Sequence, residues 1–537
     1  MAMNISMPKP QNFPNPNYRG DDAQWSALQA AAKHLPKGMD VPLVIGGEEI
    51  FTSQKLESID PHSGEVFCTG QAATPELAQK AVDAALAAKD AWASLPIESR
   101  IQKFRDLEWV LHQRQHEFIA VTMAECGYIS TEVAVEWAEV IDFIRFNPWF
   151  YLELSRVSMG DGQHETNTMN LRPLKGFTAA ITPFNFPIAI GYNLPTVMAL
   201  CGNTVVWKPS TDSLMTAWML MRALRDADFP PGVINMLTGS GAKTMPAVLR
   251  HPQITACNFT GSFDTARDIG QNLMGKEIPR PHFPRFVAET GGKDFLVVDE
   301  HCNVWDVAAQ IVTGAFGRSG QKCSANSLVL PHKKVWPDLK AAILEQLKSF
   351  KVGHATDRAT DMGPVINAGA FATITGFIQR AKEDSKVKLV HGGEYSAAKG
   401  YYIQPTIFEV AADRHELVNV EIFGPVVAVR VVDDVEHAIR VIQGNDYRLT
   451  GAVWSSDESF LAKWVPVLGE YAGNFYVNRK TTGAVVDQQP FGGDGASGTN
   501  YKAGGMWYLL QFLSQGTVTR RHARVLPKPG PWGWLDR

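Results

Sequence analysis

The sequence predicts an α/β protein built on a doubly wound sheet of the dinucleotide-binding type. Between residues 177 and 289, short apolar runs alternate with helical stretches, and about 15 to 30 residues separate successive runs. Apolar strands at this spacing are typical of a parallel sheet that helices cover on both faces. A second α/β segment is predicted from about residue 299 to 489. The strands predicted for the first sheet are residues 177–181, 204–207, 233–237, 255–259 and 286–288.

Length and composition narrow the class of protein. A chain of 537 residues is too long to fold around a single hydrophobic core of ordinary size, so the sequence indicates two or three domains. With 45% hydrophobic residues, 20% charged residues and a net charge of -4, the composition is typical of a soluble globular protein. No uncharged apolar run reaches the roughly 18 residues of a membrane span. We therefore expect a small-molecule substrate, and neither nucleic acid nor a membrane as a partner.

The cysteines and histidines indicate neither disulfides nor a metal. The six cysteines are scattered without a CxxC pair, which fits a reducing compartment. His112 and His116 have the spacing of a helical metal pair, but no nearby residue completes a site. Residues 1–20 are rich in Pro and Asn and lack the pattern of a secretory or transit peptide, so we expect a cytoplasmic protein.

The first part of the chain predicts an arm, a hairpin and helices. Prolines oppose regular structure in residues 1–40, apart from a short helix at 22–33. Residues 41–52 read as two strands joined by Gly46 and Gly47. Thr74 and Pro75 are typical of a helix start, and two further helices are predicted at 104–124 and 131–146.

The turn after the fourth predicted strand is a candidate phosphate site. The GxGxxG fingerprint of dinucleotide-binding folds is missing, and the turn reads Thr260, Gly261, Ser262 instead. Gly261 permits a tight turn, while Ser262 and the helix N-terminus after it can donate hydrogen bonds to a phosphate. The motif alone is a weak signal.

Glu289 and Cys323 are the candidate catalytic residues. Glu289 follows a predicted strand and precedes paired glycines, a position where open α/β sheets bind ligands. Cys323 lies between small and cationic residues, and we expect a helix start and Lys322 to lower its pKa and favour the reactive thiolate. Either residue alone is more often structural than catalytic, as a buried thiol or a solvated turn residue.

The order of the motifs around this pair resembles the aldehyde dehydrogenase superfamily. The resemblance extends from about residue 42 to 516, and seven ordered motifs are far more specific than one. The motifs are PFNFP (183–187), KPS (208–210), FTGS (259–262), ETGGK (289–293), GQKCS (320–324), EIFGP (421–425) and PFGG (490–493).

This resemblance implies a mechanism and the cofactor NAD. Cys323 would add to an aldehyde, the Asn185 amide and the Cys323 N–H would bind the oxyanion, and Glu289 would activate water to hydrolyse the thioester. Thr211 stands where many NAD-preferring members carry an acidic residue, which leaves discrimination against NADP open. The cofactor-binding residues that the resemblance implies are Thr182, Lys208, Gly261, Ser262, Glu421 and Phe423.

The resemblance also implies a domain plan. Residues 1–40 would form the arm, 41–298 the NAD-binding domain, 299–489 the catalytic domain, and 490–537 a return to the cofactor domain. Segments 157–171 and 510–518 would form the flap through which such enzymes become homo-oligomers, dimers or larger. Residues 520–524 read as solvated surface, and 526–534 as an irregular tail.

Within the superfamily, residues 472–478, 482–486, 488–493 and 496–500 are similar to the 1-pyrroline-5-carboxylate dehydrogenases, which oxidise L-glutamate γ-semialdehyde to L-glutamate in proline catabolism. A different ω-semialdehyde or an aliphatic aldehyde is the alternative substrate. A CoA-acylating enzyme and a non-catalytic protein are disfavoured by Glu289 and by the intact catalytic set. We expect Asp487 to face solvent, because an inward carboxylate would repel the substrate. The implied substrate residues are Ser324, Gly483, Ala484, Phe491 and Glu132.

Overall fold

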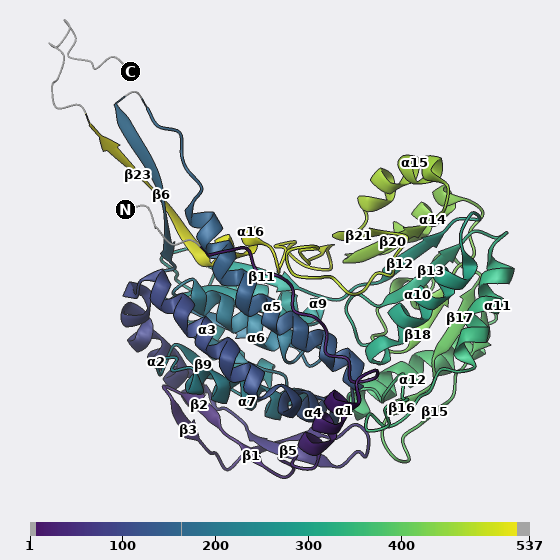
Figure 1. Cartoon of the computed structure of the whole chain (residues 1–537), viewed down its shortest axis with the longest axis horizontal. Coiled ribbons are helices and arrows are strands. Elements are labelled where there is room, and N and C mark those ends of the chain that lie inside the picture. The colour runs from purple at the N-terminus through teal and green to yellow at the C-terminus, as the bar shows by residue number, and fades with distance from the viewer. Residues whose placement is uncertain (1–6, 163, 523–537) are drawn as a thin grey trace, which may run out of the picture.

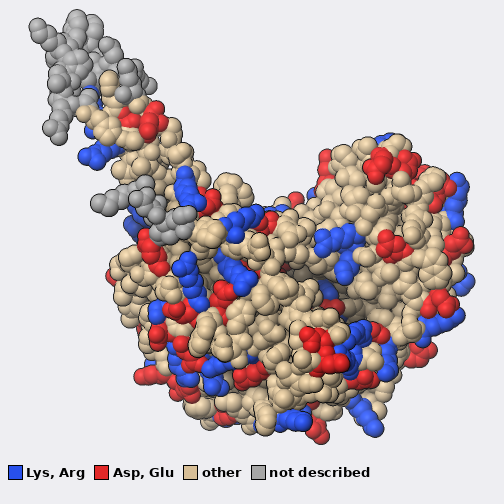
Figure 2. All heavy atoms as spheres, viewed as in Figure 1, with Lys and Arg blue, Asp and Glu red and all other residues tan. Residues whose placement is uncertain are grey.

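The computed structural model describes residues 7–162 and 164–522. Two lobes face one another, and a long two-stranded ribbon projects away from them (Figure 1). Acidic and basic side chains are interspersed over the face shown in Figure 2, and a hollow opens between the lobes. None of the helices in the described ranges combines the length and the apolar character that crossing a membrane would require.

The predicted parallel sheet forms the centre of the first lobe, and the predicted fold class is confirmed. Its order is β11-β10-β7-β8-β9-β2-β3, with neighbours parallel from β11 to β9. The predicted hairpin extends this sheet antiparallel to β9. The strands are β2 (Leu43–Ile45), β3 (Glu48–Ile50), β7 (Phe177–Ile181), β8 (Val205–Lys208), β9 (Ile234–Met236), β10 (Ile254–Thr260) and β11 (Arg285–Glu289).

Helices cover both faces of this sheet, as a doubly wound fold requires. One face packs against α2 (Pro75–Ser94), α8 (Gly241–Leu249) and α9 (Phe263–Met274). The other packs against α6 (Ala189–Leu200) and α7 (Leu214–Asp226). Thr74 caps α2 as predicted, accepting a hydrogen bond from the Leu77 N–H.

Three parts of the N-terminal lobe differ from the prediction. The single helix expected at 104–124 is two helices, α3 (Ile97–Gln113) and α4 (Gln115–Cys126), because the backbone of Arg114 leaves the helical region at φ -117°. The next helix, α5 (Ser130–Ser155), runs well past residue 146 and contains Pro148. A small sheet was not predicted: it pairs β1 (Asp40–Val41), β5 (Val66–Gln71) and β4 (Lys55–Ile59). The predicted short helix is α1 (Asp22–Ala32).

The second lobe is also a doubly wound sheet, in the order β14-β17-β18-β13-β12-β20-β21. Only β14 runs antiparallel to its neighbour. The strands are β12 (Asp294–Val298), β13 (Asn326–Pro331), β14 (Val387–His391), β17 (Thr406–Val410), β18 (Val426–Val429), β20 (Thr450–Trp454) and β21 (Asn474–Val477). One face packs against α10 (Val304–Phe316) and α11 (Trp336–Leu347), and the other against α12 (Ala368–Glu383), α14 (Val435–Ile442) and α15 (Glu458–Gly469).

The change from the first sheet to the second comes earlier than expected. We expected the catalytic segment to begin at residue 299, but β12 already lies in the second sheet between β13 and β20. The chain therefore changes sheets between Glu289 and Asp294, directly after the candidate base. Gly292 in this short link lies close to other backbone, because a Cβ there would be 2.6 Å from the Cys323 carbonyl oxygen.

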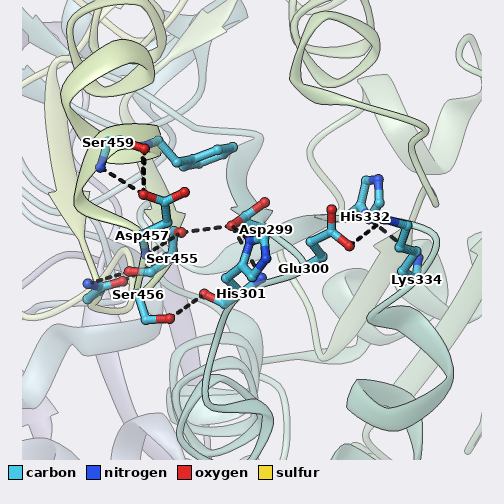
Figure 3. A network of polar contacts seen from close by, with 11 residues as sticks. Asp299, Glu300, His301, His332, Lys334, Ser455, Ser456, Asp457 and Ser459 are labelled. Carbon is cyan, nitrogen blue, oxygen red and sulfur yellow. Dashed lines mark hydrogen bonds and ion pairs between the residues drawn. The ribbon is translucent and has the colours of Figure 1, made fainter.

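The carboxyl ends of β12 and β20 are tied together on the far side of the second sheet (Figure 3). The Ser455 hydroxyl donates to Asp299 at 2.8 Å, and the Ser456 N–H donates to the His301 carbonyl at 2.6 Å. These hydrogen bonds lie at the edge of the second sheet that is opposite to the edge where β12 and β13 begin. Cys323, just before β13, therefore lies at the amino edge of this sheet.

The projecting ribbon pairs the two predicted flap segments. Strand β6 (Glu165–Pro173) runs antiparallel to β23 (Leu513–Arg521) over nine residues of each strand. Most of the β23 side chains are exposed. Of the basic cluster at 520–524, only the first three residues are among those described, and the predicted tail at 526–534 lies outside them.

Candidate active site

A pocket between the lobes brings the two candidate catalytic residues together. Glu289 ends β11, Cys323 lies in the turn between the 3-10 helix η2 (Gly317–Gly320) and β13, and both line the pocket. Glu289 comes from the carboxyl edge of the first sheet and Cys323 from the amino edge of the second. The five predicted substrate residues also line it: Glu132, Ser324, Gly483, Ala484 and Phe491.

The predicted cause of a lowered pKa at Cys323 is wrong. Cys323 does not begin a helix, and Lys322 pairs with Glu132 at 2.7 Å. Burial raises the pKa of the Cys323 thiol well above its usual range, and the nearby carboxylates of Glu289, Asp294 and Glu421 raise it further. The resting thiol is therefore neutral and must lose its proton when it reacts.

Glu289 has the properties of a general base at neutral pH. Burial raises the pKa of its carboxyl from 4.5 to about 7, and the positive charge of Lys502 lowers it by a smaller amount. A pKa near the working pH gives a base that is both ionised and basic enough to take a proton from water.

Asn185 is held in place by a residue that the sequence analysis did not single out, Arg318. The Arg318 guanidinium donates to the Asn185 carbonyl and lies 4.2 Å from the centre of the Phe186 ring. It pairs with Glu136 at 2.9 Å, and Glu136 accepts from the N–H groups that begin α6. The Oδ1 atom of Asn185 is buried without a partner among the described residues.

Two signals could have pointed to Arg318. It stands three residues before the Gln-Lys-Cys motif, and α5 carries acidic residues at helical spacing in Glu132 and Glu136. Its backbone is left-handed at φ 56°, an uncommon conformation for a side-chain-bearing residue. The sequence does not reveal this conformation, because the turn is held by tertiary contacts.

Four of the six predicted cofactor residues, Thr182, Lys208, Gly261 and Ser262, lie at the carboxyl edge of the first sheet. Lys208 ends β8, and its carbonyl accepts from the Thr182 N–H at 3.1 Å. Gly261 follows β10, and a Cβ there would lie 2.6 Å from the Phe259 ring. Ser262 caps α9, because its hydroxyl accepts from the Thr265 N–H at 3.3 Å. A phosphate at this helix would therefore meet backbone N–H groups.

Glu421, another predicted cofactor residue, lies near the catalytic residues. Its Oε1 accepts from the Gly292 N–H at 2.9 Å, whereas Oε2 accepts no hydrogen bond from the described residues. A Cβ at Gly291 would overlap this carboxylate, so any larger residue there would displace the Glu421 side chain. Phe423 has φ 55° and packs edge-on against Phe184, with ring centres 5.9 Å apart. The free oxygen of Glu421 fits a ribose hydroxyl, and this supports the prediction of NAD.

The opposite end of the pocket presents hydrogen-bond donors. The N–H groups of Gly483 and Ala484 donate no backbone hydrogen bond within the described chain. Gly483 has φ 86°, a conformation that favours glycine. Together with Ser324, whose side chain lines the same wall, these donors can hold a carboxylate.

Three charged groups near this end differ from the prediction or were missed. Glu132 pairs with Lys322, so it does not offer a free carboxylate to an ammonium group. Glu139 also lines the pocket, and burial raises the pKa of its carboxyl to about 8. Asp487 does not line the pocket, but it does not face open solvent as expected, because its side chain pairs with Lys9 at 2.6 Å and is only 20% exposed.

No metal site accompanies the pocket in the part of the chain that the structure describes, since no three metal-ligating side chains cluster there. His112 lies 3.5 Å from Glu108, and His116 contacts the Tyr18 hydroxyl at 2.9 Å. Each histidine therefore has a partner within the protein.

Comparison with known proteins agrees with this geometry. Residues 50–518 match the aldehyde dehydrogenase family. The chain is 36% identical over 525 residues to a mitochondrial Delta-1-pyrroline-5-carboxylate dehydrogenase from Emericella nidulans, covering 95% of this chain and 92% of that one. It is 37% identical over 484 residues to 1-pyrroline-5-carboxylate dehydrogenase from Anoxybacillus flavithermus, covering 90% and 93%. A crystal structure of the Mycobacterium tuberculosis Delta-pyrroline-5-carboxylate dehydrogenase bound with NAD matches with a TM-score of 0.93 at 34% identity, covering 100% of both chains.

Proposed function

The chain belongs to the aldehyde dehydrogenase family, and on this basis we propose that it oxidises L-glutamate γ-semialdehyde to L-glutamate with NAD, a step of proline catabolism. The aldehyde is the open form of 1-pyrroline-5-carboxylate. One observation carries the choice of substrate: the unpaired N–H groups of Gly483 and Ala484 share a pocket with the Cys323 thiol. A substrate with an aldehyde at one end and a carboxylate at the other satisfies both.

The first half of the reaction makes a covalent adduct on Cys323. The Cys323 thiol passes its proton to water, its sulfur forms a bond to the aldehyde carbon, and the carbonyl π bond breaks so that the oxygen becomes an alkoxide. The side-chain amide of Asn185 and the N–H of Cys323 donate to this oxyanion, and Arg318 fixes the Asn185 backbone. When bound, NAD would supply the acceptor for the hydride that this carbon loses as the thioester forms.

The second half releases the acid. Glu289 takes a proton from a water molecule, whose oxygen attacks the thioester carbon. The carbon–sulfur bond then breaks, Cys323 leaves as a thiolate, and glutamate is formed. Phe491 lines the pocket where it can pack on the aliphatic part of the substrate.

A comparison of two aldehydes tests this proposal. Pentanal matches the chain length of glutamate γ-semialdehyde but has a methyl group in place of the carboxylate and a hydrogen in place of the α-ammonium group. A site built to pair a polar group can reject an analogue without it by as much as about 10⁴-fold. We expect kcat/KM to favour the semialdehyde strongly, and glutamate to inhibit competitively. Equal kcat/KM values would reject the substrate and favour a general aliphatic aldehyde dehydrogenase.

We also propose that the protein is a homo-oligomer that assembles through the β6–β23 ribbon. An isolated two-stranded ribbon is marginally stable in water, and its outer strand edges have unpaired backbone groups. Sedimentation of the purified protein would give the size of the assembly, and a monomer would reject the proposal. The expected cytoplasmic location stays a prediction, which fractionation of cells would test.

A further inference from the structure

The N-terminal arm, residues 7–20, lies against the part of the pocket that would bind the substrate carboxylate. Its dark purple trace crosses α5 before it reaches α1 (Figure 1). The arm is fixed at its root, because Tyr18 is fully buried and its hydroxyl contacts His116 at 2.9 Å. Arg19, next in the chain, pairs with Asp361 of the second lobe at 2.9 Å. The C-terminal end of the arm is therefore tethered to both lobes.

Asn12 joins two walls of the pocket from outside. We call residues 482–489 the anchor loop, since it contains Gly483 and Ala484. The Asn12 amide donates to the Val486 carbonyl of this loop at 3.0 Å and to Asp142 of α5 at 2.8 Å. Its oxygen accepts from Gln488 of the loop at 2.9 Å. Val486 and Phe143, the neighbour of Asp142, both line the pocket.

Lys9 forms an ion pair with a residue of the same loop. Its ammonium group lies 2.6 Å from Asp487, whose side chain is 20% exposed. Asp487 has φ 70°, a conformation that costs free energy for any residue except glycine. Its N–H donates to the carbonyl of Gly504, another pocket residue, at 2.8 Å. Lys9 therefore neutralises a carboxylate in the loop that would bind an anion, at a strained point of that loop.

We propose that Lys9 and Asn12 are positioning residues for recognition of the substrate carboxylate. Neither residue lines the pocket, so neither contacts the substrate directly. Asn12 holds the anchor loop against α5 so that the Gly483 and Ala484 N–H groups converge before the substrate arrives, which spares binding the cost of ordering the loop. Lys9 removes the repulsion that the Asp487 charge would exert on the carboxylate. This inference rests on the proposed function.

Single variants of the full-length enzyme test the inference. For Lys9→Ala and Asn12→Ala, we expect KM for glutamate γ-semialdehyde to rise roughly three- to tenfold, the range of one lost hydrogen bond or ion pair. We expect kcat, and kcat/KM for pentanal, to stay within about twofold, because the catalytic residues do not touch the arm. Lys9→Arg should restore the wild-type KM. Lys80→Ala is the matched control, since it removes an exposed lysine whose partner Glu48, at 3.0 Å, lies away from the pocket.

A double variant distinguishes loss of the Lys9–Asp487 ion pair from a nonspecific effect of the substitution. In an Asp487→Gly background the loop loses both the charge and the left-handed strain, so Lys9→Ala should no longer change KM. An equal effect of Lys9→Ala in both backgrounds, or a proportional loss with pentanal, would overturn the inference. If the wild type itself does not prefer glutamate γ-semialdehyde over pentanal, the proposed function fails. If the wild type has this preference but the arm variants match Lys80→Ala, only the positioning role fails.

Discussion

Replacing the candidate base tests the order of events in the pocket. Burial raises the pKa of Glu289 to about 7, so about one tenth of the enzyme carries the ionised base at pH 6 and about nine tenths at pH 8. A general base acts only when it has lost its proton, so its contribution is present above pH 7 and is lost as the pH falls. Turnover limited by thioester hydrolysis should therefore rise about tenfold between pH 6 and pH 8.

Glu289→Gln should remove this rise and slow the steady state by about 10² to 10⁴, the usual contribution of a general base. Thioester formation does not need that base, so a burst of one NADH per site should remain. Stopped-flow absorbance at pH 6, 7 and 8 separates the burst from the steady rate. Loss of the burst in step with the steady rate would assign Glu289 to removal of the Cys323 proton. A wild-type rate independent of pH over this range would refute the assignment of the base.

Three further variants follow from the geometry. Cys323→Ala should abolish oxidation while calorimetry still detects NAD binding, because the thiol is needed for chemistry and not for the cofactor; turnover by the folded variant would reject the mechanism. Arg318→Met should lower kcat and destabilise the protein by about 3 to 5 kcal/mol in thermal unfolding, because it leaves a buried carboxylate unpaired; unchanged values of both would remove Arg318 from the site. Gly291→Ala should weaken NAD binding at least tenfold in titration calorimetry, since its methyl group would displace Glu421; wild-type affinity would place the cofactor elsewhere.

The positions of the parallel strands in the first sheet were predictable because each strand is a short apolar run. Runs of this kind identify strands of either sheet equally well, but they do not say which sheet a strand joins. Strand β12 follows Glu289 after only a short glycine-containing link, and its apolar pattern matches that of β11. Its pairing with β13 and β20 is a long-range property. The division between α3 and α4 was missed because Leu111 and Phe118 are about two helical turns apart, so the apolar face of one helix reads as continuous across Arg114.

The candidate site was predictable to the extent that its residues are contiguous motifs. The motifs around Glu289, Cys323 and Gly483 all contribute residues to one pocket. They did not give the charges of those side chains. Desolvation dominates the pKa of both Glu289 and Cys323, and desolvation depends on how the two lobes enclose the pocket.

Two lysines show why local charge is a poor guide to electrostatics in this protein. Lys322 adjoins Cys323 in the chain, yet its ammonium group pairs with Glu132 of α5, so it does not overcome the burial that raises the thiol pKa. Lys9 is far from the pocket in sequence, yet it neutralises Asp487 of the anchor loop. In each case the partner carboxylate lies on an element that only the tertiary fold brings near. The charge that a substrate meets is therefore set by pairs formed across elements, and a lysine beside a cysteine in the sequence is insufficient evidence for a thiolate.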